Sequence, residues 1–404
     1  MKRTARQAAA ILVTLALGAS ACSRNTSETA TTGGDEKVAK IGVIVPLSGS
    51  LSAYGLGIKN SVDLAVKQAN ESGKVKGWRF VVDAQDDAGK PEQGASAANK
   101  LASDPTVAAV VGTYNSSVAQ QVAPILQRAR IAQISPANTN PTLTRGPDTA
   151  NPVRVSDTYF RVCTIDSLQA PFAADYAFKT ANLKTVVSVH DKKTYGQGIA
   201  EAFEKRFKEL GGQVLSQETV SENDRDFGGL VTKVTGLKPD FVFYGGEYPA
   251  AAPLSAQLGQ GGFTGPLMGG DGIQSAEFTQ AGGRPGDLGT NVGAPIEKLP
   301  AAKRFTDAYQ AAGYKEGFEA YGALSYDAGN IIVEALAKVL PNAADVQTAR
   351  DDIVKAIGAT ANYEGVAGAT TFDQYGDTSN KVLTVYKVEG GAWKDAYSGT
   401  FGGA

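Results

Sequence analysis

Short apolar runs that alternate with helix-like segments are the feature that most constrains the fold of this chain. The run 40–46 is apolar and β-branched, as in a strand buried on both faces, and apolar residues at helical spacing follow from Ile58 to Ala69. Further strands are expected at 78–82, 107–111 and 131–134, with helices at 92–101 and 116–130. Such alternation predicts right-handed βαβ units on a parallel sheet.

A second series of the same kind begins near Tyr159. Its expected strands and helices lie, in order, at 168–181, 185–189, 196–210, 214–220, 227–235, 241–244, 250–258 and 267–269. The stretch 140–153 between the two series has three prolines and no periodicity, which predicts a long loop. Three helices at 301–312, 322–340 and 346–357 and a strand at 382–388 complete the chain. The sequence therefore predicts two α/β lobes of similar size.

Residues 1–21 have the three parts of a secretory signal peptide. Positive charges precede an apolar run at 8–17, and small residues stand directly before Cys22. The apolar run is much shorter than the ~20 residues that span a bilayer. Small residues before a cysteine resemble a bacterial lipobox, whose cysteine becomes lipid-modified. Ala19 departs from the leucine of that pattern, and together with Ala21 it also suits ordinary signal peptidase.

The segment 22–37 is expected to be the lipidated Cys22 followed by a flexible tether, because it is polar and almost free of apolar residues. Loss of residues 1–21 removes three of 39 basic residues and leaves 36 against 41 acidic ones, a formal charge of −5. That charge gives no general attraction to nucleic acid.

Histidine and cysteine are too scarce for several kinds of chemistry. His190 is the single histidine, which excludes any site that needs two. Cys22 and Cys163 are too few for a disulfide framework or a thiolate-rich metal site. Cys163 lies in a strand-like run and is expected to be a buried structural thiol. Neither a metal nor a cofactor is expected.

Polar and aromatic residues gather where the expected strands end. The segments concerned are 46–55, 112–117, 135–139, 190–198, 245–248 and 269–272. In open α/β sheets, ligands bind at the carboxyl ends of the strands. These segments are therefore the predicted ligand site.

Four of these motifs carry a resemblance to a known family. They are HDKKTYGQG at 190–198, PLSGSLSAYG at 46–55, ISPANTNPTL at 134–143 and DFVFYGG at 240–246. In this order and spacing they resemble the leucine/isoleucine/valine-type solute-binding proteins of ABC importers, which have the type I periplasmic-binding fold. The resemblance extends over almost everything from Lys40 to Trp393.

The resemblance implies two Rossmann-like lobes joined by a hinge of three chain crossings. Lobe 1 would be 38–163 plus 295–372, and lobe 2 would be 164–294 plus 373–404. It implies a monomeric protein that binds an amino acid of the branched-chain type and delivers it to an ABC permease, anchored by its lipid at the outer face of the cell membrane.

The resemblance also implies which residues of lobe 1 bind the ligand. Tyr54 matches a tyrosine of the first loop, and Ser116 matches a serine at the start of the third helix. Ala137, Asn138 and Thr139 match an Ala-Ala-Thr run that clamps the ligand carboxylate. Asn138 is a departure that either adds a side-chain hydrogen bond or leaves only the backbone contact.

Four residues of lobe 2 are implied in the same way. Tyr195 matches the aromatic residue of the HDK-containing loop, and Asp271 takes the place of the acid that pairs with the ligand ammonium. Glu247 stands where the family has tyrosine, with Tyr248 beside it. An acidic Glu247 facing the pocket would disfavour a purely aliphatic ligand.

Physical chemistry supports an amino acid zwitterion at such a site. Amides at the start of the helix at Ser116, with the hydroxyls of Ser116 and Thr139, suit a carboxylate because helix N-termini favour anions. One acidic side chain pairs with the ammonium and accepts charge-assisted hydrogen bonds of ~1.5–3 kcal/mol each from it. Tyrosine faces would cover the rest of the ligand. Taken alone, Ser116 could equally be a helix cap.

Two alternatives remain open at this stage. The same fold could bind another small solute, namely an amide, urea, sugar or aromatic acid. A secreted two-lobed hydrolase is a further alternative, but it would need a nucleophile–base pair that one histidine hardly supplies. The acidic pairs at 86–87 and 351–352 do not suggest catalysis, since the first lies among turn formers and adjacent residues on a helix do not share a face. No catalytic residue is therefore expected.

Overall fold

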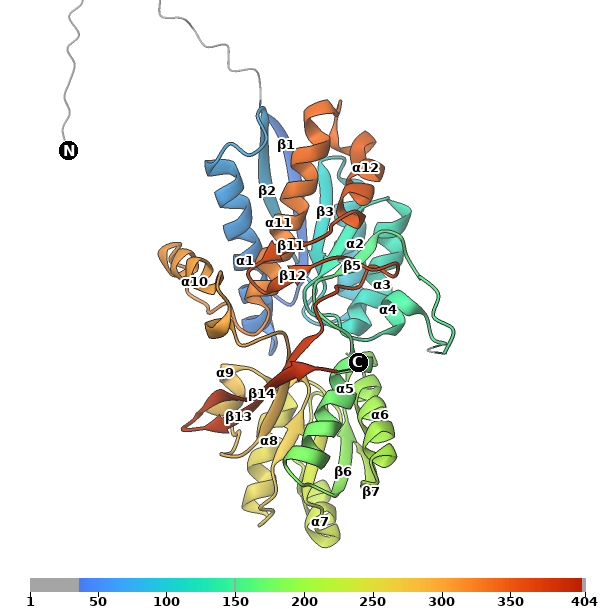
Figure 1. Cartoon of the computed structure of the whole chain (residues 1–404), viewed down its shortest axis with the longest axis vertical. Coiled ribbons are helices and arrows are strands. Elements are labelled where there is room, and N and C mark those ends of the chain that lie inside the picture. Colours follow the sequence, from blue (N-terminus) through green and yellow to red (C-terminus); the bar gives the residue numbers. More distant parts are fainter. Residues whose placement is uncertain (1–35, 149, 402–404) are drawn as a thin grey trace, which may run out of the picture. The chain divides into compact units, whose positions relative to one another are not determined.

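The fold was determined as a computed structural model that describes residues 36–148 and 150–401. The signal peptide, Cys22 and nearly all of the expected tether lie outside the described residues. Within them, the strands form two separate larger sheets, each with its own helices (Figure 1). We call these two parts the first lobe and the second lobe.

The first lobe is built on five parallel strands in the order β2-β1-β3-β4-β5. They are β1 (Lys37–Val45), β2 (Trp78–Asp86), β3 (Val107–Gly112), β4 (Ala132–Ser135) and β5 (Tyr159–Arg161). The strand order reverses between β1 and β3, so the loops that follow these strands part at that point and leave room for a ligand. The apolar run of β1 is buried on both faces, as predicted.

Helices from two distant parts of the sequence pack in the first lobe. They are α1 (Ser52–Glu71), α2 (Pro91–Ser103), α3 (Ser116–Arg128) and α4 (Thr142–Arg145), and then α10 (Ala302–Ala311), α11 (Gly322–Val339) and α12 (Val346–Gly358). Helix α11 packs on α1, and α12 packs on β3 and β4. A hairpin of β11 (Tyr363–Gly365) and β12 (Gly368–Thr370) follows α12.

The second lobe is built on seven strands in the order β14-β13-β10-β9-β8-β6-β7. They are β6 (Thr185–His190), β7 (Gln213–Thr219), β8 (Phe241–Gly245), β9 (Leu267–Gly269), β10 (Leu288–Val292), β13 (Val382–Glu389) and β14 (Ala392–Thr400). Strands β13 and β14 are antiparallel additions to a parallel sheet. Its helices are α5 (Asp166–Asp175), α6 (Thr194–Glu209), α7 (Gly228–Leu237), α8 (Tyr248–Gln260) and α9 (Ala276–Gln280).

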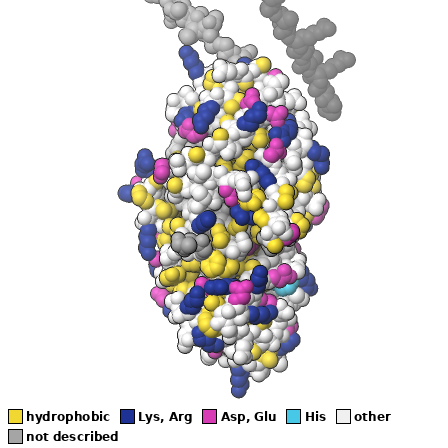
Figure 2. All heavy atoms as spheres, turned by 45° about the vertical axis from the view of Figure 1, so that its right-hand side comes forward, with side chains coloured by type: hydrophobic (Ala, Val, Ile, Leu, Met, Phe, Trp, Pro, Cys, Tyr) yellow, Lys and Arg dark blue, Asp and Glu magenta, His cyan; other side chains and the backbone are white. Residues whose placement is uncertain are grey.

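The chain passes between the two lobes three times. It leaves the first lobe after β5, returns after β10 and leaves again after β12, as the colours of Figure 1 allow the reader to follow. The residue-by-residue lobe boundaries stay a prediction. On the face seen in Figure 2, apolar side chains gather at the level between the lobes, and charges of both signs are interspersed over each lobe.

Several expected elements differ in the structure. The stretch 140–153 is not wholly a loop, since Asn140 accepts hydrogen bonds from the amide and hydroxyl of Thr142 and supports the single turn of α4. Strand β1 begins at Lys37 rather than residue 40, because Lys37 pairs with Trp78 of β2. The helix expected at 168–181 is α-helical only as far as Asp175, and Tyr176–Thr180 then form a π-helical turn.

Candidate functional site

A small cavity lies between loops from both lobes. Its lining consists of Tyr114, Asn115, Ser116, Ala137 and Tyr321 from the first lobe and Tyr195, Glu247, Asp271 and Gly272 from the second. The cavity volume is about 10 Å³, barely enough for one water molecule. A ligand as large as an amino acid therefore requires the two walls to move apart.

Asp271 forms one end of this cavity. It begins a 3₁₀ turn directly after β9 and is only 1% exposed. Its Oδ1 accepts hydrogen bonds from the Tyr195 hydroxyl at 2.9 Å and the Gln169 amide at 3.0 Å, and its Oδ2 accepts one from the Tyr321 hydroxyl at 2.9 Å. Burial raises the pKa of Asp271, which these three donors partly offset. No lysine or arginine of the described chain forms a salt bridge with Asp271.

A second buried carboxyl lies behind Asp271. The side-chain amide of Gln169 donates to Asp166 Oδ1 at 3.1 Å as well as to Asp271, and the Gln169 oxygen accepts from the Asp271 amide. Burial, and then the charge of Asp271, raise the pKa of Asp166 to about 8. This end of the cavity thus holds two carboxyls whose direct partners are neutral groups, which suits a cationic group on the ligand.

The start of helix α3 forms another part of the wall. Asn115 is the N-cap residue, but its side chain makes no capping hydrogen bond. The first N–H groups of a helix have no acceptor within it. The amides of Val118 and Ala119 bond to the Asn115 carbonyl, whereas the described part of the chain offers no acceptor for the Ser116 amide. Because a helix N-terminus carries partial positive charge, the Ser116 amide and hydroxyl suit a carboxylate.

Glu247 is the second acidic residue of the lining, and it is 6% exposed. Its Oε2 lies 2.6 Å from the Lys193 ammonium, and its Oε1 accepts from the side-chain amide of Asn115 at 2.7 Å. Burial disfavours the Lys193 charge, but Glu247 and the neighbouring Asp191 outweigh burial and raise the pKa of Lys193. Glu247 faces the cavity as an acid paired with Lys193, and the expectation that it disfavours a purely aliphatic ligand stays a prediction.

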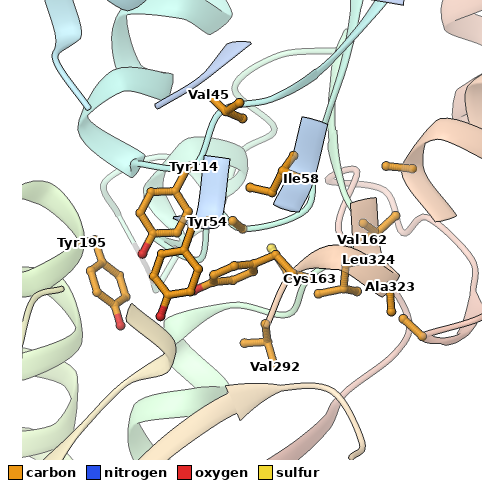
Figure 3. Close-up of a cluster of buried hydrophobic side chains, with 14 of the residues drawn as sticks. Val45, Tyr54, Ile58, Tyr114, Val162, Cys163, Tyr195, Val292, Ala323 and Leu324 are labelled. Carbon is orange, nitrogen blue, oxygen red and sulfur yellow. The ribbon is translucent and has the colours of Figure 1, made fainter. Parts of the chain in front are cut away.

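Tyrosine rings form part of the wall and stand directly behind it. Tyr54 stacks on Tyr114 with ring centroids 5.1 Å apart, and Tyr321 and Tyr248 meet Tyr54 edge-on at 5.2 and 5.3 Å. Figure 3 shows Tyr54 and Tyr114 side by side, with Tyr195 facing them from α6. The hydroxyl of Tyr195 accepts from the Gly272 amide while it donates to Asp271. These contacts couple the aromatic wall to the acidic end.

Five of the sequence-predicted ligand residues line the cavity, and four do not. Those in the lining are Ser116, Ala137, Tyr195, Glu247 and Asp271. Tyr54 and Tyr248 stand behind the lining, and Tyr248 donates its hydroxyl to the Ser50 carbonyl of the other lobe. Thr139 is fully buried outside the lining, and its hydroxyl has no partner among the described residues.

Asn138 also lies outside the lining. Its side chain donates to the Tyr114 carbonyl at 2.7 Å and accepts from the hydroxyls of Tyr159 and Thr113. The side chain is thereby committed to supporting the loop that carries Tyr114. The backbone of Asn138 is also engaged, because its N–H donates to Ser135 Oγ and its carbonyl accepts from Arg161. The choice that the sequence left open for Asn138 therefore stays a prediction.

Sequence reasoning missed four lining residues. Tyr114 and Asn115 directly precede Ser116 in a polar segment already singled out, so their position at a strand end was an available signal. Gly272 directly follows Asp271. Tyr321 enters after the second crossing, far from every motif, and only the three-dimensional structure brings it to Asp271.

The described residues show no group of three or more His, Cys, Asp or Glu side chains placed to hold a metal ion. No helix among them is long and apolar enough to cross a membrane. Cys163 is buried, as expected. Asp86 accepts hydrogen bonds from the amides of Leu47 and Ala88, a structural role in its turn.

Comparison with known proteins identifies the family. The sequence matches the profile described as periplasmic binding protein over residues 38–392. The chain belongs to the periplasmic binding protein family. This family consists of extracytoplasmic solute-binding proteins rather than enzymes.

Similar proteins agree with this assignment. The chain is 33% identical over 354 residues to Leu/Ile/Val-binding protein homolog 3 of Brucella melitensis, covering 87% of this chain and 91% of that protein. A leucine-binding protein structure from Thermotoga maritima matches with a TM-score of 0.79 at 29% identity, covering 89% of this chain and 98% of the other.

A branched-chain amino acid transporter substrate-binding protein from Streptococcus pneumoniae, in complex with isoleucine, also has a TM-score of 0.79. Its identity is 28%, over 90% of this chain and 99% of the other. This periplasmic binding protein therefore has the two-lobed type I fold that the sequence predicted.

Proposed function

We propose that this protein binds an amino acid between its two lobes and delivers it to the permease of an ABC importer. The observation that carries the proposal is Asp271, a buried carboxyl in the cavity wall whose partners are all neutral. A ligand ammonium would supply the missing cation through charge-assisted hydrogen bonds. The α3 N-terminus at Ser116, in the same cavity, suits the ligand carboxylate.

Similarity to the Brucella, Thermotoga and Streptococcus proteins makes leucine, isoleucine and valine the proposed ligands. Tyr54, Ala137, Asn138, Thr139, Tyr195, Glu247 and Tyr248 complete the proposed site with Ser116 and Asp271. The lobes of the proposed hinge are 38–163 plus 295–372 and 164–294 plus 373–404. The protein is proposed to act as a monomer that is held at the outer face of the cell membrane by a lipid on Cys22.

Isothermal titration calorimetry with three matched compounds tests the site. Leucine carries both charges, isocaproic acid lacks the ammonium and isoamylamine lacks the carboxylate. The proposal expects leucine to bind and each analogue to lose at least about tenfold, since every missing charge leaves a buried partner unpaired. Equal binding of isocaproic acid would contradict the amino acid assignment and favour an acid ligand.

Membrane fractionation tests the proposed anchor. The Cys22→Ala protein is expected to leave the membrane fraction, because a lipid anchor is what would hold this otherwise soluble chain there. A Cys163→Ala protein is the matched control and should stay with the membrane. Persistent membrane association of the Cys22→Ala protein would contradict lipidation.

A further inference from the structure

The side chains of Asn115 and Glu247 form a hydrogen bond across the boundary between the lobes. Asn115 precedes α3 in the first lobe, and Glu247 precedes α8 in the second. The side-chain NH₂ of Asn115 donates to Glu247 Oε1 at 2.7 Å, and both residues line the cavity. Asn115 is 3% exposed and Glu247 6% exposed. Any ligand that parts the two walls at this point also parts a buried donor from a buried acceptor.

An amino acid side chain would need more space than the cavity now offers. Its volume of about 10 Å³ holds about one water molecule, which is too little for a side chain of the size of leucine or asparagine. An aliphatic side chain placed between the walls would offer nothing to the Asn115 donor or to the Glu247 oxygen. Buried polar groups that lose their partners are costly, which is why sites built to hydrogen-bond a ligand reject analogues that cannot.

The rest of the lining is also polar or aromatic, apart from Ala137 and Gly272. Among its nine residues, no aliphatic side chain is larger than that of Ala137. Asn115 Oδ1 is buried with no hydrogen-bond partner among the described residues. Lys193 already pairs with Glu247, so no cation on the ligand side chain is needed to balance the charge of Glu247. A neutral group that both donates and accepts matches this wall.

A primary amide is such a group, because its NH₂ donates and its C=O accepts. We infer that the site takes an amino acid whose side chain ends in a primary amide, held between Asn115 and Glu247, more tightly than an aliphatic one of the same shape. The ligand NH₂ would donate to Glu247, and its C=O would accept from Asn115. This inference rests on the proposed function, since the ammonium and carboxylate positions are the same, but it puts an amide side chain in place of leucine, isoleucine or valine as the preferred ligand.

Asparagine and leucine have side chains of nearly the same shape and form the matched pair for the test. Calorimetry on the intact mature protein should give asparagine a Kd at least tenfold lower than that of leucine, equivalent to about 1.4 kcal/mol. For the longer pair, glutamine should bind more tightly than methionine by the same factor. Asn115→Leu should abolish or reverse this preference. This substitution removes no capping bond from α3, but it leaves Glu247 Oε1 without its buried donor, so the folding of the variant is checked as well.

Glu247→Met is the second variant and should also abolish the preference, while Glu222→Gln is the control. Glu222 is another acidic partner of Lys193, at 2.7 Å, but does not line the cavity, so its loss should leave the preference intact. Thermal unfolding confirms that each variant is folded.

The outcomes separate the two proposals. Leucine binding as tightly as asparagine, and methionine as tightly as glutamine, would overturn the inference and leave the amino acid function standing. An amide preference that survives both Asn115→Leu and Glu247→Met would overturn the assignment to these residues. Failure of every amino acid to bind would overturn the proposed function itself.

Discussion

Two buried carboxylates line the same cavity, and their surroundings differ in one decisive respect. Asp271 is held by two tyrosine hydroxyls and an amide, all neutral. Glu247 lies 2.6 Å from the Lys193 ammonium. A buried charge is stable when it is paired, so Asp271 lacks a cation that Glu247 already has. The comparison indicates that residue type alone does not tell which acid of a pocket binds a ligand cation.

Removal of the Asp271 charge is expected to have the largest effect. Asp271→Asn should weaken leucine binding at least about a hundredfold, because the ligand ammonium would be buried without a counter-charge. Calorimetry measures the change. Tyr195→Phe is the control, since it removes one hydrogen bond to Asp271 and leaves the charge. An affinity within about threefold of wild type would remove Asp271 from the ammonium position.

The absence of a paired lysine or arginine at Asp271 and Asp166, among the described residues, can also be tested without a ligand. The pKa of Asp166 is raised to about 8, so the folded protein retains this proton at pH values where the unfolded chain, with a pKa near 3.9, has lost it. The contribution of Asp166 to the free energy of unfolding is therefore fully present at low pH and is lost as the pH rises from about 4 to about 8.

Asp166→Asn mimics the protonated carboxyl at every pH. Between about pH 5 and pH 8, wild type should lose about 1 to 4 kcal/mol of unfolding free energy relative to this variant, at up to 1.36 kcal/mol per pH unit. Urea denaturation at both pH values measures the difference. Parallel loss in the two proteins would show that Asp166 carries no raised pKa.

The smallest effect is expected at the other carboxylate. Glu247→Gln should change leucine affinity by less than about threefold, because leucine makes no hydrogen bond to Glu247 and Lys193 retains Glu222 as a partner. Calorimetry under the conditions used for Asp271→Asn gives the direct comparison. A loss as large as that of Asp271→Asn would mean that the two acids share one role.

The sequence predicted much of the fold because its strands are apolar runs. The parallel strands β1, β3, β6 and β8 were all expected close to their observed positions. Strands β10, β11, β12 and β14 were missed. Strand β10 has the sequence LGTNV, whose Gly and Asn have low strand propensity, and it is fixed by pairing with β9 and β13. Tertiary pairing, which leaves little local signal, decides such strands.

The cavity could be predicted in part for a related reason. Ser116, Glu247 and Asp271 lie within a few residues of strand ends, where topology concentrates ligand-facing residues. The sequence could not reveal that Glu247 has Lys193 as a partner, because the two residues are 54 positions apart in the chain. It could not bring Tyr321 to Asp271 either, since that contact depends on how the lobes meet.

Small-angle X-ray scattering tests most directly whether one ligand joins the two lobes. We expect the lobes of the ligand-free protein to open in solution, because the described cavity is too small to admit an amino acid. Asp271 and Glu247 lie in one lobe and Ser116 and Asn115 in the other, so a ligand favours closure around it by contacts that the open form cannot make. Scattering with and without saturating leucine or asparagine should show a smaller radius of gyration with ligand. Asp271→Asn at the same ligand concentration should keep the ligand-free radius. Equal radii for wild type with and without a ligand that calorimetry shows to bind would contradict the account.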